Sequence, residues 1–237
     1  MCSTNWVREG LCSFMAATGL WCAMTGGAAW AESLSEVQLG AKWTTEHKVK
    51  SVVGPSVQVD EQGRVSMAWM EEDKDVRSVL YARGAESGGP MGAPVRINRP
   101  EDVPYWRQEA PALVVQGEDV FVTWGLAHPK ATPQQPFATE LRLSRSTDGG
   151  RTFQPSIAVN DDPGVIQHTF DALHRDADGR LHLSWIDGRE GKKELGTYVA
   201  RSLDRGETIT KNLKVDEGTC VCCRTAVTSG PEGMVYV

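Results

Sequence analysis

The stretch Ser146-Thr-Asp148-Gly-Gly150-Arg-Thr152-Phe153 decides the fold of this 237-residue chain, because a near copy follows at Ser202-Leu-Asp204-Arg-Gly206-Glu-Thr208-Ile209. Ser, Asp and Thr side chains at this spacing bond nearby backbone groups and close a tight hairpin. The glycine supplies a positive φ, and the last apolar residue plugs the core. A degenerate copy begins at Gly84. Because a catalytic residue occurs once and a hairpin staple recurs, we expect a structural role for Ser146, Asp148, Gly150, Thr152, Phe153, Ser202, Asp204, Gly206 and Thr208.

The segments around these hairpins repeat in the same register. Before each copy lie a period-2 strand that ends in tryptophan and a shorter strand that ends in arginine, and a further strand opens eleven residues after the copy starts. The tryptophans are Trp69, Trp124 and Trp185, and the arginines are Arg83, Arg145 and Arg201. The four strands expected in the first unit lie around 56–59, 64–69, 79–83 and 95–98. Such a unit is typical of a β-propeller blade.

The two complete segments resemble the Asp-box of sialidases and related propellers, with Ile209 in place of the aromatic residue. The resemblance covers residues 55–237 and implies an all-β propeller of four-stranded blades, with six blades in a full ring. About three and a half blades are expected here, too few to close a ring. Two interpretations are open: a fragment of a longer protein, or a short chain completed by oligomerisation.

The first 31 residues have the pattern of an export signal. Arg8 precedes an apolar stretch over 11–29, and Ala29-Trp30-Ala31 predicts cleavage after Ala31. We therefore expect a periplasmic or secreted protein with no membrane span after cleavage. Residues 32–54 are expected to form a cap or a ring-closing strand. The net charge of −6, with no basic block, disfavours nucleic acid as a partner.

Function on a repeated frame is expected in the connections that do not repeat, because these border the mouth of the propeller channel. The register places them at 99–109, 161–170 and 217–224. We expect a glycan or small-molecule ligand there. The candidate ligand-binding residues are Tyr105, Trp106, His168 and Asp171.

The resemblance also implies a chemistry. Sialidases of this type hold the substrate carboxylate with three arginines and use an aspartic acid and a glutamate-activated tyrosine. Arg107, Glu109 and Arg224 are the candidate catalytic residues, because guanidinium groups bind carboxylates in a bidentate manner. The early Arg-Ile-Pro motif of the family is absent, since Arg96-Ile-Asn98 falls in an outer strand. Enzymatic activity is therefore left open; an active protein would be an exo-sialidase-like glycoside hydrolase.

Three clustered cysteines carry the alternative function. Cys220, Cys222 and Cys223 are the cysteines that remain after signal cleavage. Their thiolates suit copper or zinc, with His168 as a nitrogen ligand, at the mouth of a non-catalytic propeller that binds this metal or a protein partner. A disulfide to a cysteine outside this chain is the other interpretation.

Overall fold

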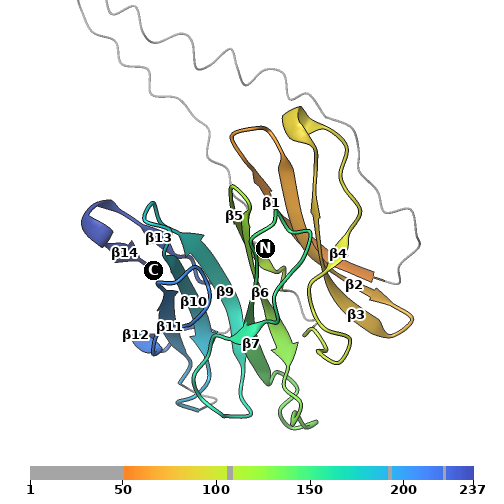
Figure 1. The fold of residues 1–237 in the computed structure, drawn as a ribbon. Coiled ribbons are helices and arrows are strands. Elements are labelled where there is room, and N and C mark those ends of the chain that lie inside the picture. Colours follow the sequence, from red (N-terminus) through yellow and green to blue (C-terminus); the bar gives the residue numbers. More distant parts are fainter. Residues whose placement is uncertain (1–50, 106–108, 192–193, 221–222) are drawn as a thin grey trace, which may run out of the picture. The chain divides into compact units, whose positions relative to one another are not determined.

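The structure is a computed structural model that describes residues 51–105, 109–191, 194–220 and 223–237 (Figure 1). The described residues form β-strands, turns and two short 3₁₀ segments, Glu86–Gly88 and Pro231–Gly233. None of their helices is long or apolar enough to cross a membrane. The strands are β1 (Ser51–Val59), β2 (Val65–Asp73), β3 (Val76–Arg83), β4 (Val95–Arg96), β5 (Ala112–Gln116), β6 (Asp119–Ala127), β7 (Thr139–Ser146), β8 (Ile157–Ala158), β9 (His168–Arg175), β10 (Leu181–Asp187), β11 (Gly196–Ser202), β12 (Leu213–Glu217), β13 (Thr228–Ser229) and β14 (Val235–Tyr236).

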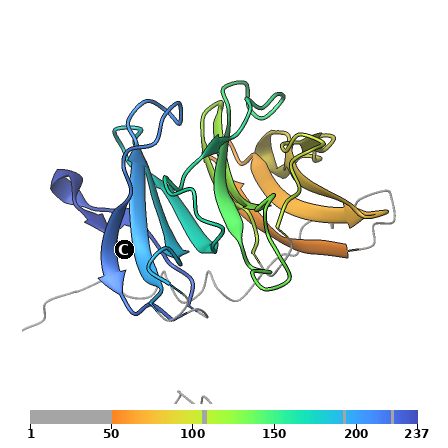
Figure 2. The ribbon, with the colours of Figure 1, turned by 90° about the horizontal axis from the view of Figure 1, so that it is seen from below.

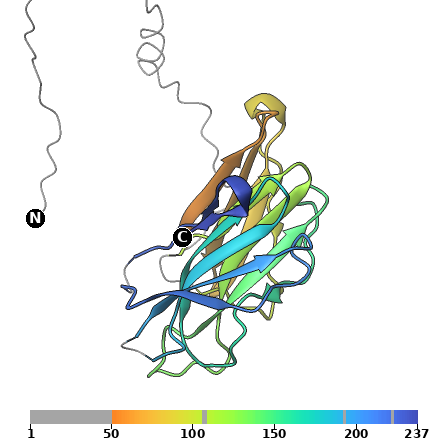
Figure 3. The ribbon, with the colours of Figure 1, turned by 90° about the vertical axis from the view of Figure 1, so that its left-hand side faces the viewer.

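These strands form three four-stranded antiparallel sheets, each a meander in chain order, and β13 pairs with β14. The sheets fan out side by side in Figure 2, and Figure 3 looks onto the third sheet with β13 and β14 beside it. The all-β propeller architecture expected from the repeat is confirmed, with three four-stranded blades and two strands of a further sheet. β1 and β9 begin earlier than the repeat predicts, at Ser51 and His168.

Apolar side chains pack between the blades, because each sheet has two faces to cover. The cluster between the first and second blades contains Ala68, Met70, Val79, Tyr81, Ile97, Leu113, Val120, Val122 and Trp124. The cluster between the second and third contains Val114, Phe121, Leu141, Leu143, Val159, Leu181, Leu183, Trp185, Tyr198 and Ala200. The tryptophans Trp124 and Trp185 are thus part of the inter-blade cores.

The Asp-box hairpins have the structural role that the repeat predicts. Ser146 Oγ accepts from the Gly150 amide at 2.9 Å, and Asp148 accepts from the Thr152 amide and hydroxyl at 2.9 and 2.6 Å. The same bonds recur in the second Asp-box, as Ser202 to Gly206 and Asp204 to Thr208. Gly150 has φ 85°, and a side chain there would collide with Tyr81 of the preceding blade.

Because each blade is a meander, the connections from outer to inner strands and the β6–β7 and β10–β11 loops all lie at one end of the sheets. We call this the connection end. The inner strand β5 lies beside β1 and β9, and β13 lies beside β9. The first residues of neighbouring inner strands therefore meet at the connection end, and the Asp-boxes lie at the opposite end.

Candidate functional site at the channel mouth

A β-bulge sets the direction of the Asp171 side chain in β9, the inner strand of the third blade. Two residues of β9, Phe170 and Asp171, stand opposite the single residue Trp185 of β10. Phe170 has φ 56°, a conformation that costs free energy in a residue with a side chain. The Thr225 hydroxyl donates to the Phe170 carbonyl at 2.7 Å and holds this backbone in place. Bulges of this kind re-aim side chains beside functional sites.

Glu109 lies just before the inner strand of the second blade and is buried, with 6% of its surface exposed. Burial and the negative charge of Asp171 raise the pKa of Glu109 to about 8. A hydrogen bond from the Phe170 backbone and the charge of Arg224 oppose the rise. Burial likewise raises the pKa of Asp171, whose carboxylate accepts a hydrogen bond from the Thr123 hydroxyl. The two carboxyl groups thus hold a proton at neutral pH that isolated carboxyl groups would have lost.

Arg224 lies before β13 and completes this group from a third connection. Its guanidinium carbon is 5.7 Å from the centre of the Phe170 ring. A cavity of about 350 Å³ opens between the inner strands, and Asp171 and Arg224 both line it. The remaining lining residues come from β1, from β5 and the loop before it, and from β9. Carboxyl groups that retain a proton beside a guanidinium can donate that proton and help to bind an anionic group.

The other residues predicted for this site lie in different surroundings. Tyr105 is buried, and its amide donates to the Gly125 carbonyl at 2.7 Å. Trp106, Arg107 and Cys222 lie outside the described residues. Cys220 and Cys223 are exposed, and the Cys223 amide donates to the Cys220 carbonyl at 3.1 Å. The structure therefore brings together Glu109, Asp171 and Arg224, and the roles of all the candidates remain predictions.

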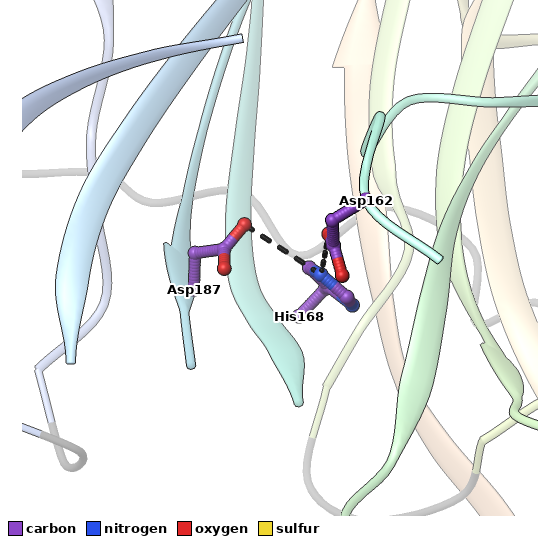
Figure 4. Close-up of side chains that lie close together, drawn as sticks. All are labelled: Asp162, His168 and Asp187. Atoms are coloured by element: carbon purple, nitrogen blue, oxygen red, sulfur yellow. Dashed lines mark hydrogen bonds and ion pairs between the residues drawn. The ribbon is translucent and has the colours of Figure 1, made fainter. Parts of the chain in front are cut away.

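His168 belongs to a second polar cluster, between the second and third blades. Its ring is buried, with Nδ1 2.5 Å from the Thr139 carbonyl and Nε2 2.8 Å from an Asp162 carboxylate oxygen. Asp187 lies on the other side of Nε2 at 3.6 Å (Figure 4). Burial lowers the pKa of His168, but Asp162, Asp187 and the Thr139 carbonyl outweigh it and raise the pKa above 6.5. These acceptors on both sides of the ring favour its charged form.

Arg189 supplies the second cation of this cluster. Its guanidinium lies 2.8 Å from Asp187, 2.8 Å from Asp161 and 3.3 Å from Asp162, and it stacks 4.2 Å from the centre of the Tyr198 ring. Burial would raise the pKa of Asp162, but the hydrogen bond and charge of His168, the Gly164 amide and the charge of Arg189 hold it at about 2.

Asp162, His168 and Asp187 are also close enough to be considered as metal ligands. Their ligand atoms lie within 4.8 Å of one another, the spacing a metal ion would need, and no other such group occurs in the described part of the chain. The guanidinium of Arg189 already neutralises both carboxylates. Because a cation at this position would be repelled by Arg189 and would displace the His168 proton, these residues do not fit a metal site.

Sequence reasoning missed Thr123 and the network around Arg189. Thr123 is part of the repeated strand that precedes Trp124, so nothing in the pattern separates it from a core position. Asp187-Gly188-Arg189 was detectable, because this charged turn follows Trp185 where the second blade has Leu126. The Asp-Gly step and the arginine after it are typical of a tight turn, but Asp161 and Asp162, which pair with Arg189, come from the preceding connection.

Comparison with known proteins supports the fold. No protein-family profile and no curated protein sequence matches the chain. A Dyadobacter fermentans protein of unknown function has a similar structure, with a TM-score of 0.54 and 15% identity over 81% of this chain and 57% of that protein. The chain thus spans little more than half of that relative. The chain is similar in fold to sialidase-like propellers.

Two enzymes with solved structures also show some similarity to this chain. A Trypanosoma rangeli sialidase mutant displaying trans-sialidase activity has a TM-score of 0.49 and 13% identity, over 77% of this chain and 33% of the enzyme. An endo-arabinase from Bacteroides thetaiotaomicron has a TM-score of 0.46 and 14% identity, over 76% and 67%. At these identities the likeness concerns the fold alone.

Proposed function

We propose that this chain forms part of an exported glycan-binding propeller related to glycoside hydrolases, with Glu109, Asp171 and Arg224 as its ligand site. The supporting observations are that Asp171 and Arg224 line one cavity and that Asp171 and the nearby Glu109 both have raised pKa values. Perturbed carboxyl groups of this kind mark functional sites, because a structural role is better served by paired, ionised groups. Residues 1–31 act as the export signal in this proposal.

Each residue has a distinct role in the proposed site. Glu109, protonated near neutral pH, donates its proton to the oxygen of a glycosidic bond, and the charge of Asp171 maintains that proton. Arg224 binds a carboxylate, as in an acidic sugar, through its guanidinium fork. Phe170 fixes the position of Arg224 by lying beneath it. The finer form of the proposal is exo-sialidase chemistry.

The test is turnover of a fluorogenic sialoside by the full-length protein. We expect Glu109→Gln and Arg224→Ala to reduce turnover by about 100-fold or more, the usual contribution of a general acid. Arg151→Ala is the matched control, because Arg151 lies on the Asp-box end and its side chain is 78% exposed. Calorimetric binding of N-acetylneuraminate that is lost in Arg224→Ala, without turnover, would support a binding function only. The absence of both turnover and binding would contradict the proposal.

The alternative function is metal binding by the cysteine loop. Cys220 and Cys223 are exposed at the connection end and joined by a backbone turn, which favours access by a metal ion. Stoichiometric binding of copper or zinc that is lost in Cys222→Ser would support it. A mass spectrum that assigns these cysteines to a disulfide would exclude it.

A further inference from the structure

A second cavity, of about 660 Å³, lies at the connection end between the loops of the second and third blades. It shares no lining residue with the cavity of Asp171 and Arg224. Its walls come from the β6–β7 loop, the connection before β9, the β10–β11 loop and the turn after β12. The described lining residues carry no charge: Pro133, Gln134, Gln135, Pro136, Phe137, Ala138, Val165, Ile166, Gln167, Gly188, Leu195, Gly218 and Thr219.

Hydrogen bonds between the loops hold this cavity open before any ligand arrives. Gln135 donates its side-chain amide to the Val165 carbonyl at 2.7 Å. Backbone bonds join Thr139 to Ile166 at 2.8 Å and Thr219 to Leu195 at 2.8 Å. Each wall is thus tied to its neighbour, so binding costs little ordering of the loops.

One polar group in the wall has no acceptor. The Nε2 atom of Gln167 is buried and makes no hydrogen bond among the described residues, although the Gln167 carbonyl accepts from the Gly188 amide at 3.1 Å. A buried donor without an acceptor costs about 1–3 kcal/mol, and a ligand oxygen would recover that cost. A Cβ at the neighbouring Gly188 would lie 3.3 Å from Gln167 Cγ, so a larger side chain there would require the Gln167 side chain to shift.

An aromatic residue provides the apolar side of the cavity. Phe137 is 45% exposed, and Pro133, Pro136 and Leu195 line the same cavity. A sugar ring has a face of C–H groups that packs on such side chains and an edge of hydroxyl groups that accept from an amide. A sugar carboxylate would find no cation among the described lining residues.

We propose that this cavity is a second binding site, which accepts a neutral sugar ring between Phe137 and the Gln167 amide. It goes beyond the proposed function and does not depend on Glu109, Asp171 or Arg224. Its position at the connection end would let a branched or extended glycan contact both cavities.

The test uses calorimetric titration of the full chain with methyl β-glucopyranoside and with its carboxylated counterpart, methyl β-glucuronoside. We expect the neutral glycoside to bind, with affinity about tenfold weaker in Phe137→Ala and in Gln167→Leu, since tenfold corresponds to the loss of one hydrogen bond or contact. The charged glycoside should bind at least about tenfold more weakly than the neutral one. Leu203→Ala is the control, because Leu203 is a 65% exposed apolar residue at the opposite end.

Melting curves establish that each variant is folded before titration. Glu109→Gln should leave binding of the neutral glycoside unchanged, which separates this site from the proposed hydrolase site. The proposal is overturned if the neutral glycoside does not bind, if phenol binds while the glycoside does not, or if Leu203→Ala weakens binding as much as Phe137→Ala.

Discussion

Two polar clusters lie at the connection end, and their charges are arranged in opposite ways. Around Asp187, three carboxylates lie beside the cations Arg189 and His168, and the pKa values of Asp161, Asp162 and His168 move toward the charged form. Around Glu109, two carboxyl groups face each other under Arg224, and both pKa values move toward the neutral form. The first arrangement stabilises a blade interface, and the second retains a proton that can be transferred.

The difference teaches how to separate structural from chemical polar groups on a repeated scaffold. Asp162 and Arg189 join the connection before the third blade to the β10–β11 loop of that blade, so loss of either would loosen the packing of the two loops. Glu109 and Asp171 instead oppose folding when both are ionised. Such a cost is retained where it serves binding or catalysis.

The largest expected effect comes from removing Arg189 from the cluster around Asp187. Arg189→Leu leaves Asp187, which has no exposed surface, without its guanidinium partner. Removal of one partner of a buried pair costs about 3–5 kcal/mol, so we expect a loss of that order in the free energy of unfolding. Urea denaturation measures it. Arg151→Ala, an exposed arginine on the Asp-box end, should change the midpoint little; equal loss in both variants would refute a special role for the cluster.

The sequence predicts the frame of this molecule well, because the frame is what repeats. The tryptophan strands and the Ser146 and Ser202 hairpins appear in the predicted register, with the predicted hydrogen bonds. Their local geometry depends on residues close in sequence, and local interactions are readable from spacing.

The site is only partly predictable, because it depends on contacts between distant segments. Glu109, Asp171 and Arg224 were each selected as members of non-repeating connections, and the structure brings them together. Nothing in the sequence indicates that Phe170 adopts a positive φ and bulges the strand beside Asp171. The sequence predicts His168 as a metal ligand. Its two partners, the Thr139 carbonyl in another blade and the Asp162 carboxylate, are brought to the ring only by the fold.

A smaller effect is expected in the pH dependence of stability. The pKa of Glu109 is about 8 in the folded protein and near 4.5 when unfolded, so the folded state holds one more proton between these values. The contribution of Glu109 to stability is therefore full below pH 4.5 and falls as pH rises toward 8, by at most about 1.4 kcal/mol per pH unit. Glu109→Gln should flatten this fall. Urea midpoints between pH 4.5 and 6 lie below the range where His168 mainly contributes. The difference there between the unmodified protein and Glu109→Gln separates Glu109 from Asp171, whose pKa is also raised; equal slopes in the two proteins would contradict a raised pKa of Glu109.

The smallest effect is a difference in the titration of two histidines, visible by NMR. His168 should titrate above 6.5, held charged by Asp162, whereas burial and the nearby His182 lower the pKa of His174. Asp162→Asn removes the carboxylate that accepts from His168 Nε2, so the pKa of His168 should fall by about one unit, the scale of one lost charged partner. His174 provides the internal control, because Asp162 does not contribute to its shift. A pKa of His168 below 6.5 that does not change in Asp162→Asn would mean that the ring is neutral. The cluster around Arg189 and His168 would then lack the second cation that distinguishes it from the Glu109 site.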